Sequence, residues 1–142
     1  MEIYRPLSIA VDNFENRFGI KFDKKELLAV AFNNASKTRV RDRSVHEYNP
    51  RLTRKTLSAL GDTVLNLLSI EAELNRRSSI RYQSNSYLAN RFDILDFQQY
   101  LPTMCRSDET KGNAIEAVLG AIYLDQGLET ARDFCTNGII AT

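Results

Sequence analysis

The chain has 142 residues, of which 43% are hydrophobic, and its 19 basic and 18 acidic side chains leave a net charge of +1 at pH 7. This length predicts one domain spanning residues 1–142, large enough to bury about two thirds of the surface of the unfolded chain. So small a net charge does not by itself indicate a nucleic-acid-binding protein, and no apolar run is long enough to span a membrane.

Two helices and a charged loop are predicted for the first fifty residues. The first helix covers residues 6–18, and the second begins after Asp23, whose side chain is expected to cap it. Helical spacing places these apolar residues inside: Leu7, Ile9 or Ala10, Phe14 and Phe18 in the first helix, and Leu27, Leu28, Ala31 and Phe32 in the second. Periodicity is lost from Ser36 to Pro50, which predicts a loop.

Positive charge is concentrated in this loop and just after it. Residues 37–55 contain the acidic side chains Asp42 and Glu47 against seven basic ones, which are Lys37, Arg39, Arg41, Arg43, Arg51, Arg54 and Lys55. A run of this kind is often only a solvated segment, but it also has the charge needed to follow the phosphates of a nucleic acid. Both interpretations are open from the residues alone.

A core helix is predicted for residues 52–74, and we expect the rest of the chain to be organised around it. Thr53 is its expected N-cap. Its apolar residues recur in steps of three and four, at Leu57, Leu60, Val64, Leu67 or Leu68, and Leu74. Two residues oppose this role, because Gly61 costs about 1 kcal/mol relative to alanine inside a helix and Asp62 is charged.

A polar segment separates this helix from the next one. Arg76 and Arg77 suit the C-terminal end of the core helix, and residues 78–86 are expected to be irregular. A helix with a short following turn is predicted over residues 87–101, ending at Pro102, and a loop over residues 105–111.

The helix that follows this loop repeats the composition of the core helix. Asn113, Glu116 and Gly120 lie along one face. Its apolar stripe lies on another face and consists of Ile115, Val118, Leu119 and Ile122. Glycines in both helices let the two backbones approach closely, which would bring Asp62 and Glu116 together. Paired carboxylates at such a crossing could hold a divalent metal ion.

A last amphipathic helix is predicted after Gly127. Its inward residues are expected to be Leu128, Ala131, Phe134 and Cys135, and the chain from Gly138 onward is expected to fray. No strand pattern competes anywhere in the sequence. The fold class predicted is therefore all-α.

The few cysteine and histidine residues argue against a zinc site and against catalysis by histidine. Cys105, Cys135 and the single histidine, His46, do not have the spacing of a zinc site, and His46 is expected to be a loop residue without a catalytic part. The first residues contain no basic-then-apolar signal sequence. We therefore expect an intracellular, cytoplasmic protein with both thiols reduced.

Three segments resemble the catalytic domain of the ribonuclease III family, metal-dependent endonucleases that cut double-stranded RNA. The resemblance covers roughly residues 20 to 140, in the family's order and spacing. Its segments are Leu57-x-x-Leu60-Gly61-Asp62-x-Val64-Leu65, Leu88-Ala89-Asn90-Arg91, and Ile115-Glu116-Ala117-x-x-Gly120-Ala121-Ile122-Tyr123-Leu124-Asp125-x-Gly127-Leu128-Glu129. It implies the family's all-helical endonuclease fold.

The resemblance also implies a catalytic pair, Asp62 and Glu116, that binds Mg²⁺ or Mn²⁺ with help from Ser58 and Asn113. The family has four acids at this site. Here Ser58 stands in place of a glutamate and Asn113 in place of an aspartate, while Lys55 occupies a further acidic position. One interpretation is an enzyme with a weaker metal site, as in the compact mini-ribonuclease III type, which also departs from the four-acid pattern. The alternative is a catalytically inactive scaffold that binds RNA or a protein partner.

The substrate implied is double-stranded RNA, bound by Lys37, Arg39, Arg41, Arg43, Arg51 and Arg54. No separate RNA-binding domain is expected in this chain, so a protein partner is a possible source of additional RNA binding. Family members are two-fold dimers, and a homodimer is expected here, with an apolar interface formed by Leu57, Leu60, Val64 and Leu68. The family's phenylalanine that plugs into the other subunit is replaced by Ala59.

Two alternatives for the site remain open at this point. Asp62 could be an ordinary helix acid paired with an arginine such as Arg91. Asn90 and Arg91 could bridge helices by hydrogen bonds, or Arg91 could be a surface residue.

Overall fold

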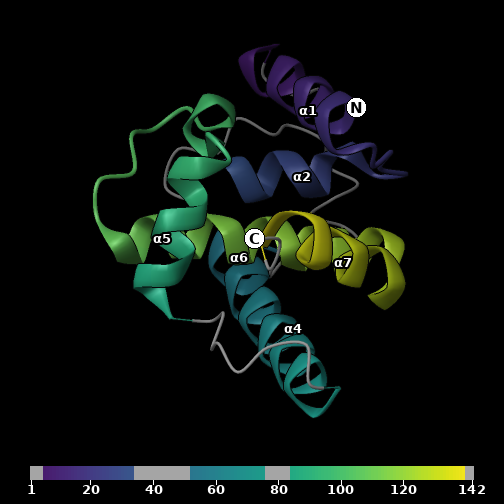
Figure 1. Ribbon diagram of the computed structural model, residues 1–142. Coiled ribbons are helices and arrows are strands. Elements are labelled where there is room, and N and C mark those ends of the chain that lie inside the picture. Colours follow the sequence, from purple (N-terminus) through teal and green to yellow (C-terminus); the bar gives the residue numbers. More distant parts are fainter. Residues whose placement is uncertain (1–4, 34–51, 76–83, 140–142) are drawn as a thin grey trace.

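The computed structural model describes residues 5–33, 52–75 and 84–139, and every regular element in these ranges is helical (Figure 1). In chain order they are α1 (Arg5–Phe18), α2 (Lys25–Phe32), α4 (Arg54–Leu74), α5 (Asn85–Ile94), the 3₁₀ turn η2 (Phe97–Tyr100), α6 (Asp108–Gln126), α7 (Leu128–Phe134) and the π turn η3 (Cys135–Ile139). The all-α prediction is confirmed. None of the described helices is both long and apolar enough to cross a membrane.

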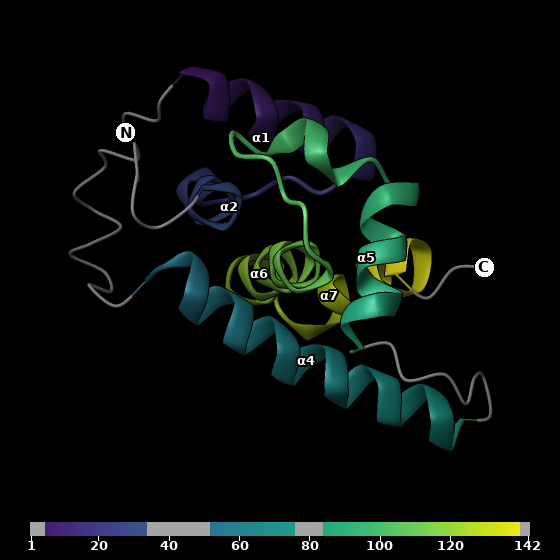
Figure 2. The same ribbon diagram turned by 90° about the vertical axis from the view of Figure 1, so that its left-hand side faces the viewer.

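The centre of the molecule is α6. Figure 2 shows this helix end-on, with α4 on one side and α2 and α1 on the other. Every residue from Ala114 to Ile122 is buried, Glu116 included. A helix that is apolar on all sides must be covered on all sides. The chain is therefore organised around α6, and not around the core helix of residues 52–74 that the sequence pattern favoured.

The tightest contact in the described structure lies where α4 crosses α6. A Cβ atom added to Gly61 would lie 1.7 Å from the carbonyl oxygen of Glu116, and one added to Gly120 would lie 2.2 Å from the carbonyl oxygen of Leu57. No side chain fits at such distances. Each glycine therefore offsets its unfavourable helix propensity by allowing the two backbones to touch.

The two faces of α4 have different surroundings. Leu57, Val64 and Leu68 are buried, whereas Leu67 is 49% exposed and Leu74 is 78% exposed. The prediction that Leu74 faces inward is wrong, because the C-terminal half of α4 projects beyond α6 in both views (Figures 1 and 2). Leu57, Val64 and Leu68 fill the core of this chain, so the predicted dimer interface at these residues is also wrong.

Helix starts depend on side-chain caps. Thr53 caps α4 as predicted, accepting a hydrogen bond from the Thr56 amide at 3.2 Å while its own amide donates to the Thr56 hydroxyl at 2.9 Å. Ser84 and Ser107 cap α5 and α6 by accepting hydrogen bonds from the amides of Tyr87 and Thr110. These two helices consequently begin at Asn85 and Asp108, so residues 85–86 and 108–111 are helical and not irregular as expected.

Asp23 does not cap α2. Its backbone amide and that of Lys24 donate hydrogen bonds of 2.8 and 2.9 Å to the carboxylate of Asp125, near the end of α6. The amides ahead of α2 are thus satisfied by a residue 101 or 102 positions away. Local sequence reasoning cannot detect a partner so distant.

The C-terminal end of the described chain is held in place. The Arg91 guanidinium donates to the carbonyl oxygen of Gly138 at 2.6 and 3.2 Å, and the Tyr87 hydroxyl donates to that of Ile139 at 2.6 Å. Gly138 and Ile139 are both buried. The expectation that the chain frays from Gly138 is therefore wrong for these two residues, because α5 supplies donors for their carbonyl groups.

An aromatic cluster joins α1 and α2 to the rest of the fold. Phe14 lies at its centre and contacts Phe32, Phe97, Tyr100 and Phe134, with ring centroids 5.4 to 6.1 Å apart. On α1, Ala10 faces inward and Ile9 is 51% exposed, which decides between the two predicted positions. Both cysteines are buried as free thiols, and burial raises the pKa of Cys135 to about 12.

The helix crossing generates a stability prediction. Gly61→Ala should lower the free energy of unfolding by about 3 kcal/mol or more, since overpacking of this severity forces two backbones apart. Gly138→Ala is the matched control, because the nearest atoms to an added Cβ there lie 4.0 Å away. Urea denaturation of the three proteins would measure the difference. Equal stability of Gly61→Ala and the parent would contradict the described crossing.

Candidate active site

The same crossing brings the sequence-predicted acids together. Asp62 follows Gly61 on α4, and Glu116 contributes the carbonyl group against which Gly61 packs. The side chains of Asp62 and Ser58 lie close enough to the carboxyl group of Glu116 for both to shift its pKa. The structure therefore assembles Ser58, Asp62 and Glu116 into one cluster across the two helices.

The charge on Glu116 is strongly disfavoured in this cluster. The residue is only 5% exposed. Burial is the largest cause that raises its pKa, to about 8, followed by the hydrogen bond and the negative charge of Asp62, while the Ser58 hydroxyl lowers it. Asp62 itself is exposed to solvent. The cluster is thus a pair of carboxyl groups, of which Glu116 is buried and Asp62 faces solvent.

Asn113 lies one helical turn before Glu116 on α6 and is half-buried. Residues three apart in a helix share a face, so its amide is carried on the side of α6 that bears Glu116. Together the four predicted residues supply two carboxylates, one hydroxyl and one amide. In the ranges the structure covers, no group of three or more His, Cys, Asp or Glu residues could hold a metal ion.

Arg91 is not the partner of Asp62. Its guanidinium binds the Gly138 carbonyl, as described above, so the alternative in which this arginine neutralises the aspartate is wrong. Arg91 instead bridges α5 and η3 by hydrogen bonds, whereas Asn90 is exposed.

Most of the predicted RNA-binding residues lie outside the described residues. These are Lys37, Arg39, Arg41, Arg43 and Arg51, and His46, Arg76 and Arg77 lie outside them as well. Arg54 begins α4, with its Nη2 atom 4.0 Å from the Sγ atom of Cys105. Its Nε atom is buried without a hydrogen-bond partner in the part of the chain that the structure covers.

Lys55 stands at a further acidic position of the family and was given no role at the site, yet it shares a face with the predicted site residues. It lies three residues before Ser58 and seven before Asp62 on one continuous helix. This spacing is present in the sequence, but Lys55 was grouped with the basic run that precedes it.

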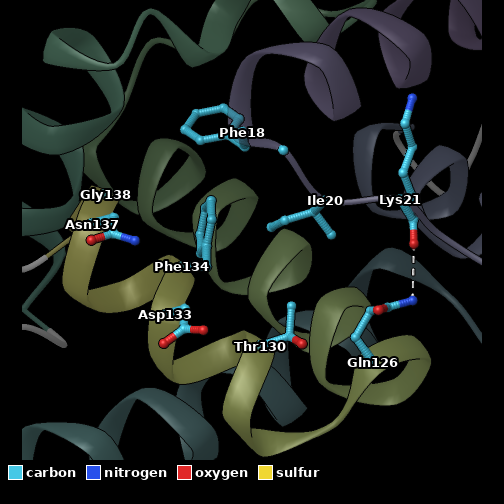
Figure 3. A pocket seen from close by; sticks show the side chains of 10 residues that line it. Phe18, Ile20, Lys21, Gln126, Thr130, Asp133, Phe134, Asn137 and Gly138 are labelled. Atoms are coloured by element: carbon cyan, nitrogen blue, oxygen red, sulfur yellow. Dashed lines mark hydrogen bonds between the residues drawn. The ribbon is translucent and has the colours of Figure 1, made fainter.

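A separate depression of about 400 Å³ lies between the end of α1, the end of α6, α7 and η3 (Figure 3). Phe18, Ile20 and Phe134 form its apolar wall, and Gln126 donates a 3.0 Å hydrogen bond across one side to the Lys21 carbonyl. Its single carboxylate is Asp133. It contains none of the clustered acids, so the candidate site is an open helix face and not this hollow.

Comparison with known sequences points to one family. No family model matches the chain. Ribonuclease 3 of Rickettsia felis is 32% identical over 146 residues, covering 88% of this chain and 61% of that protein. Ribonuclease 3 of Nitratiruptor sp. is 29% identical over 144 residues, covering 87% and 58% respectively. The chain thus spans about 58–61% of the length of these curated relatives.

Two solved structures share the fold. Both are nuclease domains of ribonuclease III from Campylobacter jejuni, and one is described for flexibility in a region involved in dimer formation. They align with TM-scores of 0.71 and 0.69 at 20% and 19% sequence identity. The alignments cover 91% and 98% of this chain, and 95% of each of those chains.

The raised pKa of Glu116 predicts how stability depends on pH in metal-free protein. A carboxyl group whose pKa is raised by folding contributes stability that is fully present below its unfolded value, near 4.5, and that is lost as the pH rises through about 8. Glu116→Gln removes this loss. Since one pKa unit corresponds to about 1.4 kcal/mol, the variant should be more stable than the parent by about 2–4 kcal/mol at pH 8.5 and nearly equal at pH 4.5.

Urea denaturation with a chelator present would measure this at both pH values. Glu109→Gln, which alters an exposed carboxylate in the first turn of the same helix, is the control and should not reproduce the gain. If the free energies of unfolding of the parent and of Glu116→Gln changed equally with pH, the fold would not hold Glu116 neutral.

Proposed function

This chain is related to bacterial ribonuclease III and has the fold of its nuclease domain, and from that premise we propose that it is a metal-dependent endoribonuclease. The proposed reaction is hydrolysis of phosphodiester bonds in double-stranded RNA. One observation carries it, namely the cluster of Ser58, Asp62 and Glu116 at the glycine-mediated crossing of α4 and α6. Its open side, at Asp62, suits a long polymer better than an enclosed pocket would.

The donor set fits Mg²⁺ or Mn²⁺. Both ions prefer oxygen ligands, and the four residues offer only oxygen donors of the carboxylate, hydroxyl and amide types. A bound divalent cation would also favour the ionised form of Glu116, which burial and Asp62 otherwise oppose. We assign Asp62 and Glu116 as the direct ligands, with Ser58 and Asn113 assisting.

Such an ion supplies an activated water, neutralises charge on the scissile phosphate and stabilises the leaving oxygen. The chain's own residues prepare the site for it. The Ser58 hydroxyl lowers the pKa of the Glu116 carboxyl group and so favours its charged form. Close packing of the two backbones at Gly61 and Gly120 fixes the separation of the helices that carry Asp62 and Glu116.

Double-stranded RNA would be held mainly through phosphates and 2′-hydroxyl groups, because side chains cannot enter the deep major groove of an A-form helix. Of the basic residues proposed for this role, Arg54 is the described one. We expect little sequence preference, since phosphate contacts position a nucleic acid without reading its bases.

We also propose a homodimer, through a face of α4 other than the one expected. Exposed residues recur along α4 in steps of four, four, three and four, at Ala59, Thr63, Leu67, Ile70 and Leu74. Leu67, Ile70 and Leu74 are 49%, 40% and 78% exposed. An apolar stripe of this period is what a second helix packs against. The same helix from a second copy would cover it and place two sites on one RNA duplex.

The inactive scaffold remains the second candidate function. The observation that favours it is the donor set itself, in which Ser58 and Asn113 are neutral and no third carboxyl group joins the described cluster. A neutral oxygen attracts a divalent cation less than a carboxylate does. The two candidates therefore differ in metal affinity, which experiment can separate.

Cleavage of a generic RNA duplex tests the proposal. Glu116→Gln should abolish Mg²⁺- or Mn²⁺-dependent cleavage while leaving RNA binding nearly unchanged, because phosphate contacts elsewhere carry most of the affinity. Glu109→Gln should cut like the parent. The measurements are gel-based cleavage and RNA affinity for each protein.

Restoring acids separates the two candidate functions. The double variant Ser58→Glu with Asn113→Asp should bind metal more tightly and cut at lower metal concentration than the parent. A parent that binds duplex RNA or a protein tightly, yet does not cut at any Mg²⁺ or Mn²⁺ concentration, would reject the enzyme proposal. The double variant would then show whether the two neutral residues alone silenced the site.

The proposed dimer makes a separate prediction. Ile70→Lys combined with Leu74→Lys should convert a two-chain species into a monomer, because it places charge on the apolar stripe of α4. Ile94→Lys, which alters an apolar residue on α5 that is 58% exposed, is the matched control and should leave the mass unchanged. Sedimentation at micromolar concentration would report the mass. A monomeric parent would contradict the dimer.

A further inference from the structure

Lys55 lies in line with the clustered acids on the surface of α4. An α-helix has 3.6 residues per turn, so the seven residues from Lys55 to Asp62 complete almost two full turns, and the two side chains leave the helix in nearly the same direction, about 10 Å apart along its axis. Ser58 lies between them on the same face. Gly61, next to Asp62, packs on the backbone of Glu116, and Ser58 and Asp62 both shift the pKa of Glu116, so this face of α4 is the one beside the site.

The ammonium group of Lys55 is available. The residue is exposed, and it forms no hydrogen bond or ion pair with any residue that the structure describes. Its neighbour Arg54 points elsewhere, since one residue turns a helix by about 100° and the Arg54 guanidinium lies against Cys105. Of these two cations, Lys55 is therefore the one whose side chain can bind an anion at the site.

The position of Lys55 is electrostatically unusual. It lies in the first turn of α4, where the helix macrodipole is positive, and no acidic residue occupies that turn. A cation is disfavoured there, whereas an anion is attracted. Lys55 and the helix end would therefore attract the same anion, which gives a reason for a residue type that helix stability alone would not favour.

The charges of the two carboxylates, one metal ion and one phosphodiester sum to minus one, so a further cation such as Lys55 would balance the site. Asp62 and Glu116 together carry two negative charges when ionised, and no third carboxylate joins them among the described residues. One divalent cation balances this pair. A phosphodiester then adds one negative charge, which a second metal ion could not neutralise without ligands of its own. A lysine ammonium is a compact point charge on a flexible stem and can do so.

We propose that Lys55 binds an RNA phosphate beside the scissile bond, supplying the one positive charge that a single divalent cation at this site leaves lacking. This inference rests on the proposed function for its substrate and its metal ion. It gives a role to a residue that the sequence analysis noted only as a replacement of a family acid. Lys55 is thereby assigned as a substrate-binding residue of the site.

Salt-dependent RNA binding tests the phosphate contact without cleavage. In the Glu116→Gln background, Lys55→Ala should weaken affinity for a generic RNA duplex several-fold and reduce the slope of log affinity against log salt by about one. Lys55→Arg should retain the slope. Lys21→Ala removes an equal exposed charge from the α1–α2 connection and is the control. An unchanged slope in Lys55→Ala, or an equal loss in Lys21→Ala, would overturn the proposal.

Counting metal ions tests the single-cation site directly. Electron paramagnetic resonance of Mn²⁺ should find one bound ion per parent chain, and Lys55→Glu, which exchanges the cation for a ligand, should bind Mn²⁺ more tightly or take up a second ion. Two ions on the parent chain would overturn the proposal.

Failure of this inference can be told apart from failure of the proposed function. A parent that cuts RNA while Lys55→Ala keeps its salt slope would retain the enzyme and reject the lysine contact. A parent that does not cut, but shows the expected slope and one Mn²⁺ ion, would retain the contact and reject the enzyme.

Discussion

The contact between the backbones of α4 and α6 is the constraint on which the rest of the structure depends. Gly61 and Gly120 lie against carbonyl groups of the opposite helix, at distances that no Cβ atom could occupy. Helices normally pack 8–10 Å apart through interdigitated side chains. Removing the side chains at these two positions brings the helices closer, so that groups on both sides of the crossing share one small volume.

That volume contains a carboxyl pair that is unfavourable without a counterion. Glu116 is buried in the middle of a helix covered on all sides, and Asp62 approaches it from α4. Ser58 offsets only part of the cost. The surrounding fold is well anchored, with Asp125 holding the start of α2 and Arg91 holding the end of η3. A stable scaffold can maintain such a charge conflict where function uses it.

The sequence by itself determined the helical fold class, the crossing and the acids that meet there. Glycine is the worst ordinary residue for a helix interior, so Gly61 and Gly120 inside apolar helices indicate a close approach from the residue types alone. Asp62 and Glu116 were recognisable because a charge in a buried stripe requires a partner. Thr53 was recognisable as a cap because its partner, Thr56, is three residues away.

Other features were decided only by the tertiary structure. The stripe pattern admits both Leu67 and Leu68, and packing of one face of α4 against the fold buries Leu68 and leaves Leu67 exposed, while Leu74 lies where α4 projects beyond α6. Asp125 holds the two residues ahead of α2 from more than a hundred residues away. Helical periodicity reports which residues share a face, but the neighbours of that face are set by packing between distant segments. That is why the central role of α6 emerged only from the assembled fold.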